Sequence, residues 1–190
     1  MLYDGREHVS LLQYPEIQDR LIVLDGWSKT YAMTGWRLGM SVWPKDVIGH
    51  AEKLAVNCHS CVNAPTQFAG LAALTGPQDY IAESRVAFQR RRDLVVSMLN
   101  QAAGLKCPTP EGAFYVYPDL SALIGKTAPS GKVIETDEDF ANELLEVEGV
   151  AVVFGAAFGA SPCFRVSYAT SDKTLEEACS RIQRFCGSLK

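Results

Sequence analysis

The sequence predicts an α/β fold from two observations. Short apolar runs of strand length alternate with segments in which apolar residues recur at helical spacing. Hydrophobic residues make up 47% of the 190 residues, and the net charge is only −4, with both signs mixed along the chain. This composition argues against a disordered chain, and its weakly acidic balance offers no basic surface for binding nucleic acid.

Residues 1–78 are the first of three predicted segments, and both strands and helices are expected in it. Four elements are expected in it: a buried strand over residues 21–24 that is ended by Asp25-Gly26, a strand over residues 36–43, a helix of about twelve residues after Pro44, and a helix that runs from Pro65 to Gly76. The first of these strands matters most, because ligands of α/β sheets gather where strands end.

The rest of the chain divides into a linking helix and a second α/β region. Residues 79–104 are predicted as one long helix, with Ile81, Phe88 and Val95 at helical spacing and Gly104 at its end. Within residues 105–190 we expect three strands and two helices, in the following places: strands over residues 113–117, 150–154 and 163–168, and helices that begin at the N-caps Thr136 and Ser171.

The stretch from Ser28 to Gly39 carries the clearest chemical signal. Lys29 follows the first strand directly, and Arg37 lies eight residues further on. A lysine amine in a partly desolvated site can bond covalently to an aldehyde, and a guanidinium binds phosphate oxygens through two parallel hydrogen bonds. The pair therefore suits a phosphorylated aldehyde.

The pattern Ser-Lys-x-x-x-x-x-Gly-x-Arg-x-Gly resembles the fold-type I pyridoxal-phosphate enzymes, most closely the class I aminotransferases similar to aspartate aminotransferase. The resemblance implies that Lys29 carries pyridoxal 5'-phosphate covalently and acts as acid and base, and that Arg37 holds its phosphate. Ser28 is a weaker candidate for a phosphate contact, because the family more often places a serine where this chain has Gly26. A solvated surface lysine is the alternative interpretation.

The same resemblance names the domains. Residues 1–78 would be the C-terminal part of the large α/β/α domain that binds pyridoxal phosphate, residues 79–104 the linking helix, and residues 105–190 the small C-terminal domain. Members of the family are about twice this length, and the aspartate that pairs with the pyridine nitrogen has no counterpart here. We therefore expect a C-terminal half that is catalytically poor or inactive by itself.

Arg165 is the candidate substrate-binding residue. It lies in the strand-like segment Phe164-Arg165-Val166-Ser167-Tyr168-Ala169, whose alternation turns Arg165 to one face. The resemblance implies that this arginine binds the α-carboxylate of the substrate, for which a planar guanidinium is suited. The alternative is a structural ion pair with a carboxylate of the chain. Upstream, the family's usual proline is replaced by Phe154.

Three function classes stay open at the sequence level. The resemblance favours amino-group transfer between an amino acid and a 2-oxo acid in a homodimer. A pyridoxal-phosphate lyase or synthase could share the same residues, and so could the aminotransferase-like effector domain of a transcription regulator. The amino acid itself is not specified. The absence of arginine between Lys53 and Ser84 disfavours an aspartate-specific design with an arginine in that segment.

The six cysteines are scattered, and we expect reduced thiols and no metal. Cys58 and Cys61 have CxxC spacing, but no second pair completes a zinc set. Cys179, Ile182 and Cys186 are predicted to lie on the buried side of the last helix. No apolar run is long enough to cross a bilayer and no signal peptide is recognisable, so we expect a cytoplasmic protein without membrane contact.

Overall fold

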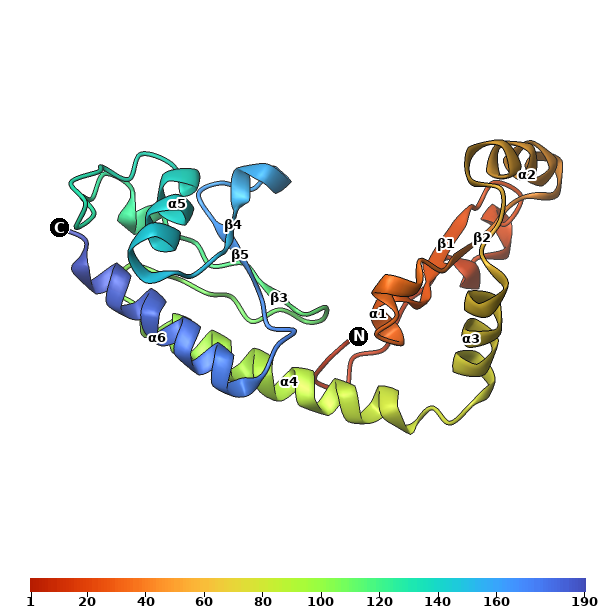
Figure 1. Cartoon of the computed structure of the whole chain (residues 1–190), viewed down its shortest axis with the longest axis horizontal. Coiled ribbons are helices and arrows are strands. Elements are labelled where there is room, and N and C mark those ends of the chain that lie inside the picture. The colour runs from red at the N-terminus through yellow and green to blue at the C-terminus, as the bar shows by residue number, and fades with distance from the viewer. The chain divides into compact units, whose positions relative to one another are not determined.

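The computed structural model describes all 190 residues, which form two compact units. Unit 1 consists of Met1 and residues 5–84, and unit 2 consists of residues 2–4 and 85–190. The two units divide inside helix α4, Asp79–Leu99 (Figure 1). None of the helices combines the length and the apolar character that crossing a bilayer would need.

Unit 1 is built on a two-stranded antiparallel sheet. Strand β1, Val23–Gly26, pairs with β2, Gly39–Val42, so that Val23 lies opposite Val42 and Gly26 opposite Gly39. Its helices are α1 (Trp27–Thr30), α2 (Lys45–His59) and α3 (Ala64–Thr75), and its 3-10 turns are η1 (Leu11–Gln13), η2 (Pro15–Ile17) and η3 (Thr34–Trp36).

The predicted helices of this unit are confirmed, and local chemistry sets their ends. Pro44 immediately precedes α2. Asn63 caps α3 by accepting a hydrogen bond from the backbone N–H of Thr66 at 3.0 Å, and Gly76 ends that helix. Proline near a helix start and a side-chain acceptor at the N-cap both suit the N–H groups that have no partner within the helix.

The prediction of a buried strand over residues 21–24 is wrong in two respects. The strand begins at Val23 and continues through Gly26, and Leu24 is 76% exposed. The strand β1 pairs only with β2, and a two-stranded ribbon has no second layer to cover Leu24. The second strand is also shorter than residues 36–43, because η3 occupies Thr34–Trp36.

Unit 2 contains a three-stranded antiparallel sheet in the order β3-β5-β4. Its strands are β3 (Tyr115–Val116), β4 (Val153–Phe154) and β5 (Phe164–Ser167), its helices beyond α4 are α5 (Asp137–Glu148) and α6 (Asp172–Ser188), and its 3-10 turns are η4 (Ser121–Leu123) and η5 (Gly155–Phe158). Every strand is shorter than the sequence indicates, although each lies where it is expected.

Helix α6 runs beside the second half of α4 within unit 2 (Figure 1). Arg91 of α4 pairs with Asp172 at 3.0 Å, and the amide of Gln183 donates to the carbonyl of Met98 at 2.7 Å. Cys179, Ile182 and Cys186 of α6 are buried in the core, which confirms their predicted orientation.

Residues 2–4 belong to unit 2 although they begin the chain. Leu2 bridges Gly112, and the backbone N–H of Tyr3 donates to the carbonyl of Glu111 at 3.0 Å. Tyr3 is almost completely buried, and Asp4 accepts two hydrogen bonds from the buried guanidinium of Arg92, at 2.6 and 2.9 Å. Because Arg92 is 3% exposed, this buried cation requires negative charge nearby, and Asp4 and Asp93 both supply it.

Candidate functional site

Lys29 lies in α1, the single helical turn that follows β1. The turn is held by Trp27, whose backbone N–H donates to Leu38 and whose buried indole N–H donates to the carbonyl of Gly70 at 3.1 Å. Gly70 also leaves room for the side chain of Leu38, which a Cβ at this position would approach within 2.3 Å. Lys29 therefore lies just after the first strand, although that strand ends at Gly26 and not at Leu24.

Arg37 approaches the same end of the sheet from the other strand. It ends η3 with φ +55°, a left-handed conformation that costs energy for any residue with a Cβ. Its guanidinium donates to the carbonyl of Thr34 at 2.9 Å and is otherwise exposed. Because Gly26 and Gly39 are paired, Lys29 and Arg37 leave the ribbon at one end.

The donor set at this end fits a phosphorylated aldehyde, since it offers one amine and one guanidinium on the two connected strands. Ser28 directly precedes Lys29 in α1. Its side chain is half-buried and makes no hydrogen bond within the chain. The expected desolvation of the lysine is not found. Lys29 is exposed and lines none of the main cavities, because the two-stranded sheet has no covering layer here.

Arg165 lies in β5 of unit 2, opposite Val153 of β4. Its Cζ atom is 4.5 Å from the ring centroid of Tyr115 and 4.2 Å from that of Phe158. No carboxylate lies within ion-pair distance of this guanidinium, so the alternative of a structural ion pair finds no support. The side chain is half-buried.

Phe158 is positioned by the turn η5, which three hydrogen bonds fix. The N–H of Gly155 donates to Cys163 at 2.7 Å, and its carbonyl accepts from the hydroxyl of Tyr117 at 3.3 Å. The N–H of Ala156 donates to the carboxylate of Asp137 at 2.9 Å. Asp137 is 1% exposed, so this bond holds η5 against the start of α5.

Sequence reasoning did not assign Tyr115, Phe158 or Asp137 to a site. Tyr115 lies opposite Ser167, two residues along β5 from Arg165, so it is the diagonal neighbour on the same face. That relation requires the strand register, which the sequence does not contain. An aromatic residue after the Gly155 turn was the only available signal for Phe158, and such residues usually pack in the core.

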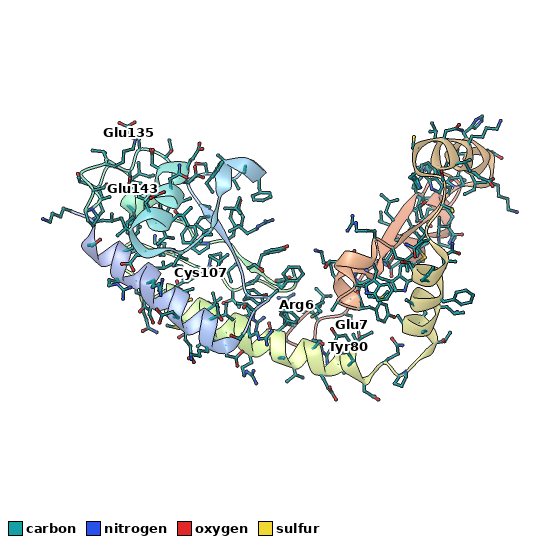
Figure 2. The ribbon with its side chains drawn as sticks, in the orientation of Figure 1. Arg6, Glu7, Tyr80, Cys107, Glu135 and Glu143 are labelled. Atoms are coloured by element: carbon teal, nitrogen blue, oxygen red, sulfur yellow. The ribbon has the colours of Figure 1, made fainter.

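The cysteines show no assembled metal site. Cys58 and Cys61 are exposed, and no group of three or more potential ligands lies together. Cys107 lies in the interior of unit 2 (Figure 2). Burial raises the pKa of its thiol to about 12. A thiol with that pKa stays protonated near neutral pH and behaves as a small apolar side chain.

Comparison with known proteins identifies the family of this chain. Residues 3–182 match the family model described as aminotransferase class I and II. The chain is 59% identical over 176 residues to a probable aspartate/prephenate aminotransferase of Rhizobium leguminosarum bv. phaseoli, covering 93% of this chain and 44% of that protein. An aspartate/prephenate aminotransferase of Cereibacter sphaeroides is 56% identical over 175 residues, 92% of this chain and 44% of that protein.

A solved structure gives the same result for the fold. The crystal structure of the aspartate aminotransferase from Rhizobium meliloti superposes with a TM-score of 0.95 at 47% identity, covering 100% of this chain and 48% of that one. The chain spans about half the length of the relatives that it matches. On the family match and these identities, the chain belongs to the class I and II aminotransferases.

Proposed function

We propose that this chain is the part of an aminotransferase that carries the cofactor lysine, a phosphate-binding arginine and a carboxylate-binding arginine. The reaction is amino-group transfer between an amino acid and a 2-oxo acid. The observation that carries the proposal is the placement of Lys29 and Arg37 at one end of the β1-β2 ribbon, in a chain that matches the family over residues 3–182.

Each residue has a separate task at the cofactor. Pyridoxal 5'-phosphate, when bound, supplies an electron sink that makes the Cα–H bond of an amino acid acidic. Lys29 would hold it covalently through Nζ, and the free amine of Lys29 would accept the proton from Cα. Arg37 fixes the phosphate by charge-assisted hydrogen bonds, and Ser28 is a secondary candidate for the same phosphate.

Arg165 orients the substrate. Its guanidinium would receive the α-carboxylate through two parallel hydrogen bonds, which sets the direction of the Cα–H bond. The absence of any carboxylate partner within the chain leaves these donors available for a ligand. The exposed position of Lys29 implies that protein outside this chain encloses the cofactor, and we propose a homodimer of the longer protein as the complete catalyst.

For the substrates, we propose aspartate and prephenate as amino donor and acceptor. The support is that the two relatives that are 59% and 56% identical are a probable aspartate/prephenate aminotransferase and an aspartate/prephenate aminotransferase. The segment between Lys53 and Ser84 holds no arginine, so the second carboxylate of aspartate must be bound by a residue outside this segment.

The test uses the full-length protein that contains this chain, with Lys29→Ala compared to Lys45→Ala, a second exposed lysine of unit 1. After incubation with pyridoxal phosphate and borohydride, peptide mass spectrometry should find the reduced adduct on Lys29. We expect K29A to lose the adduct and at least about 100-fold in transamination rate, as loss of an acid-base group implies. K45A should retain both.

Two results would contradict the proposal. An adduct on another lysine with K29A still active would remove Lys29 from its role. Steady release of pyruvate and ammonia from an amino acid, without transfer to a 2-oxo acid, would favour the lyase class instead.

A further inference from the structure

Two aromatic rings lie within cation-π distance of the Arg165 guanidinium. The distance from its Cζ atom to the ring centroid is 4.5 Å for Tyr115 and 4.2 Å for Phe158. A guanidinium directs its N–H donors in its own plane, so stacking on its faces leaves those donors free. The rings restrict where the plane can lie without consuming a hydrogen bond.

The other stacked arginines of unit 2 are arranged differently. Arg92 lies 4.9 Å from the ring of Tyr3 and pairs with Asp4, and Arg91 lies 5.4 Å from Phe88 and pairs with Asp172. Each has one ring and a carboxylate of the chain. Arg165 has two rings and no carboxylate.

The two rings come from separate, independently anchored elements. Tyr115 is fixed by its register opposite Ser167 in the β3-β5 pair. Phe158 is fixed by η5, which Asp137 and Cys163 hold through the hydrogen bonds described above. The ring of Tyr117 also meets Phe158 edge-on, with centroids 6.5 Å apart at 77°. Phe158 is nevertheless 51% exposed, so core packing does not account for its position.

We propose that Phe158 and Tyr115 are positioning residues, which hold the guanidinium of Arg165 edge-on toward an incoming carboxylate. This inference rests on the proposed function, in which Arg165 is the carboxylate ligand. The physical gain is conformational: a long, flexible side chain that is already ordered loses less entropy when the ligand binds. The rings also keep water from the faces, which strengthens the charge-assisted hydrogen bonds.

The experiment measures succinate binding to the full-length holoenzyme by calorimetry. Phe158→Leu and Tyr115→Leu should each raise the dissociation constant about fivefold, the effect of losing one exposed cation-π contact. Phe158→Tyr and Tyr115→Phe, which retain the ring, should restore native binding. Leu145→Ala is the matched control, because Leu145 is an apolar residue of unit 2 with similar exposure, 46%, and should bind as the native protein does.

Steady-state kinetics with two amines distinguish a positioning role from a purely structural one. With aspartate as donor, F158L should raise KM about fivefold with kcat nearly unchanged, since binding of the carboxylate is common to ground and transition states. With β-alanine, which is aspartate without its α-carboxylate, F158L and native protein should give the same rate. Equal losses with both amines would overturn the inference.

Arg165→Lys separates this inference from the function on which it rests. If R165K leaves succinate binding unchanged, the assignment of Arg165 to the carboxylate fails. If R165K weakens binding strongly while F158L and Y115L bind as L145A does, only the positioning role is overturned. Weaker binding in both leucine variants, with rescue by the aromatic ones, supports the inference.

Discussion

At the scale of single residues, Arg37 combines a functional side chain with an unfavourable backbone. Its φ of +55° lies in the left-handed region, and Ala32 in the same loop has φ +53°. Such conformations persist where the surroundings fix them, and they are frequent at binding sites. The loop between β1 and β2 therefore places the guanidinium at some expense in stability.

Two substitutions at this position separate side chain from backbone. Arg37→Gly should be more stable than Arg37→Ala by about 1 kcal/mol, because glycine adopts a positive φ without steric conflict. Both should weaken pyridoxal phosphate binding by about 10- to 100-fold, the value of hydrogen bonds to a charged group. Thermal unfolding and a spectroscopic titration of the full-length protein measure the two effects. Native affinity in either variant would exclude Arg37 as a phosphate ligand.

At the scale of elements, α5 begins with a complete capping box. Thr136 accepts a hydrogen bond from the N–H of Asp139 at 3.1 Å, and the carboxylate of Asp139 accepts from the N–H of Thr136 at 3.0 Å. Thr136→Ala should lower the free energy of unfolding by about 1 kcal/mol. Thr109→Ala, at an exposed threonine without such bonds, should change it by less than about 0.5 kcal/mol in the same denaturant titration.

The turn η5 depends on a glycine at its start. A Cβ at Gly155 would lie 1.9 Å from the carbonyl oxygen of Ala160 and 2.8 Å from that of Cys163. Gly155→Ala must therefore displace backbone, and we expect a loss of about 1–3 kcal/mol in unfolding free energy. Gly159→Asn, at the left-handed end of the same turn, should be tolerated far better. An unchanged denaturation midpoint for G155A would contradict the tight turn.

The helices could be predicted from the sequence, except that the linking helix ends at Leu99 and not at Gly104, whereas strand length and burial could not. Helix limits depend on local chemistry such as Asn63, Thr136 and Ser171, which the sequence displays directly. Strand burial depends on what lies above and below the sheet. An apolar run such as Leu21–Leu24 does not indicate whether another layer covers the strand, and Leu24 is exposed in the structure.

The candidate site divides in the same way. The positions of Lys29 and Arg37 follow from a contiguous motif, so the sequence alone identifies them. The aromatic neighbours of Arg165 come from two separate elements, and only the register of β3 and β5 and the turn η5 bring them to it. The spacing of residues within one segment does not predict such pairing between distant segments.

At the scale of the whole molecule, unit 2 should lose stability in acid. The hydrogen bond from Arg184 lowers the pKa of Glu148, those from Ser121 lower that of Asp119, and that from Arg91 lowers that of Asp172. A carboxyl with a depressed folded pKa stabilises the protein above its unfolded pKa of about 4, and this contribution is lost as the pH falls below it.

We therefore expect the unfolding midpoint of the chain to be level above about pH 5 and to fall between about pH 4.5 and pH 3. Calorimetric scans across this range measure it. Glu148→Gln should be less stable than native protein at pH 7 and should show a shallower decline in acid, because one of the titrating groups is gone. A midpoint that rises toward pH 3 would contradict the assignment of these ion pairs.

The attachment of residues 2–4 to unit 2 makes unit 1 an insertion within the sequence of unit 2. A polypeptide of residues 85–190 alone would lack the ring of Tyr3 and the carboxylate of Asp4, leaving Asp93 as the one carboxylate that still pairs with the buried guanidinium of Arg92. Excision of the C-terminal region for study therefore needs Leu2, Tyr3 and Asp4 kept with it, for example by a short linker that replaces residues 5–84 between Asp4 and Arg85.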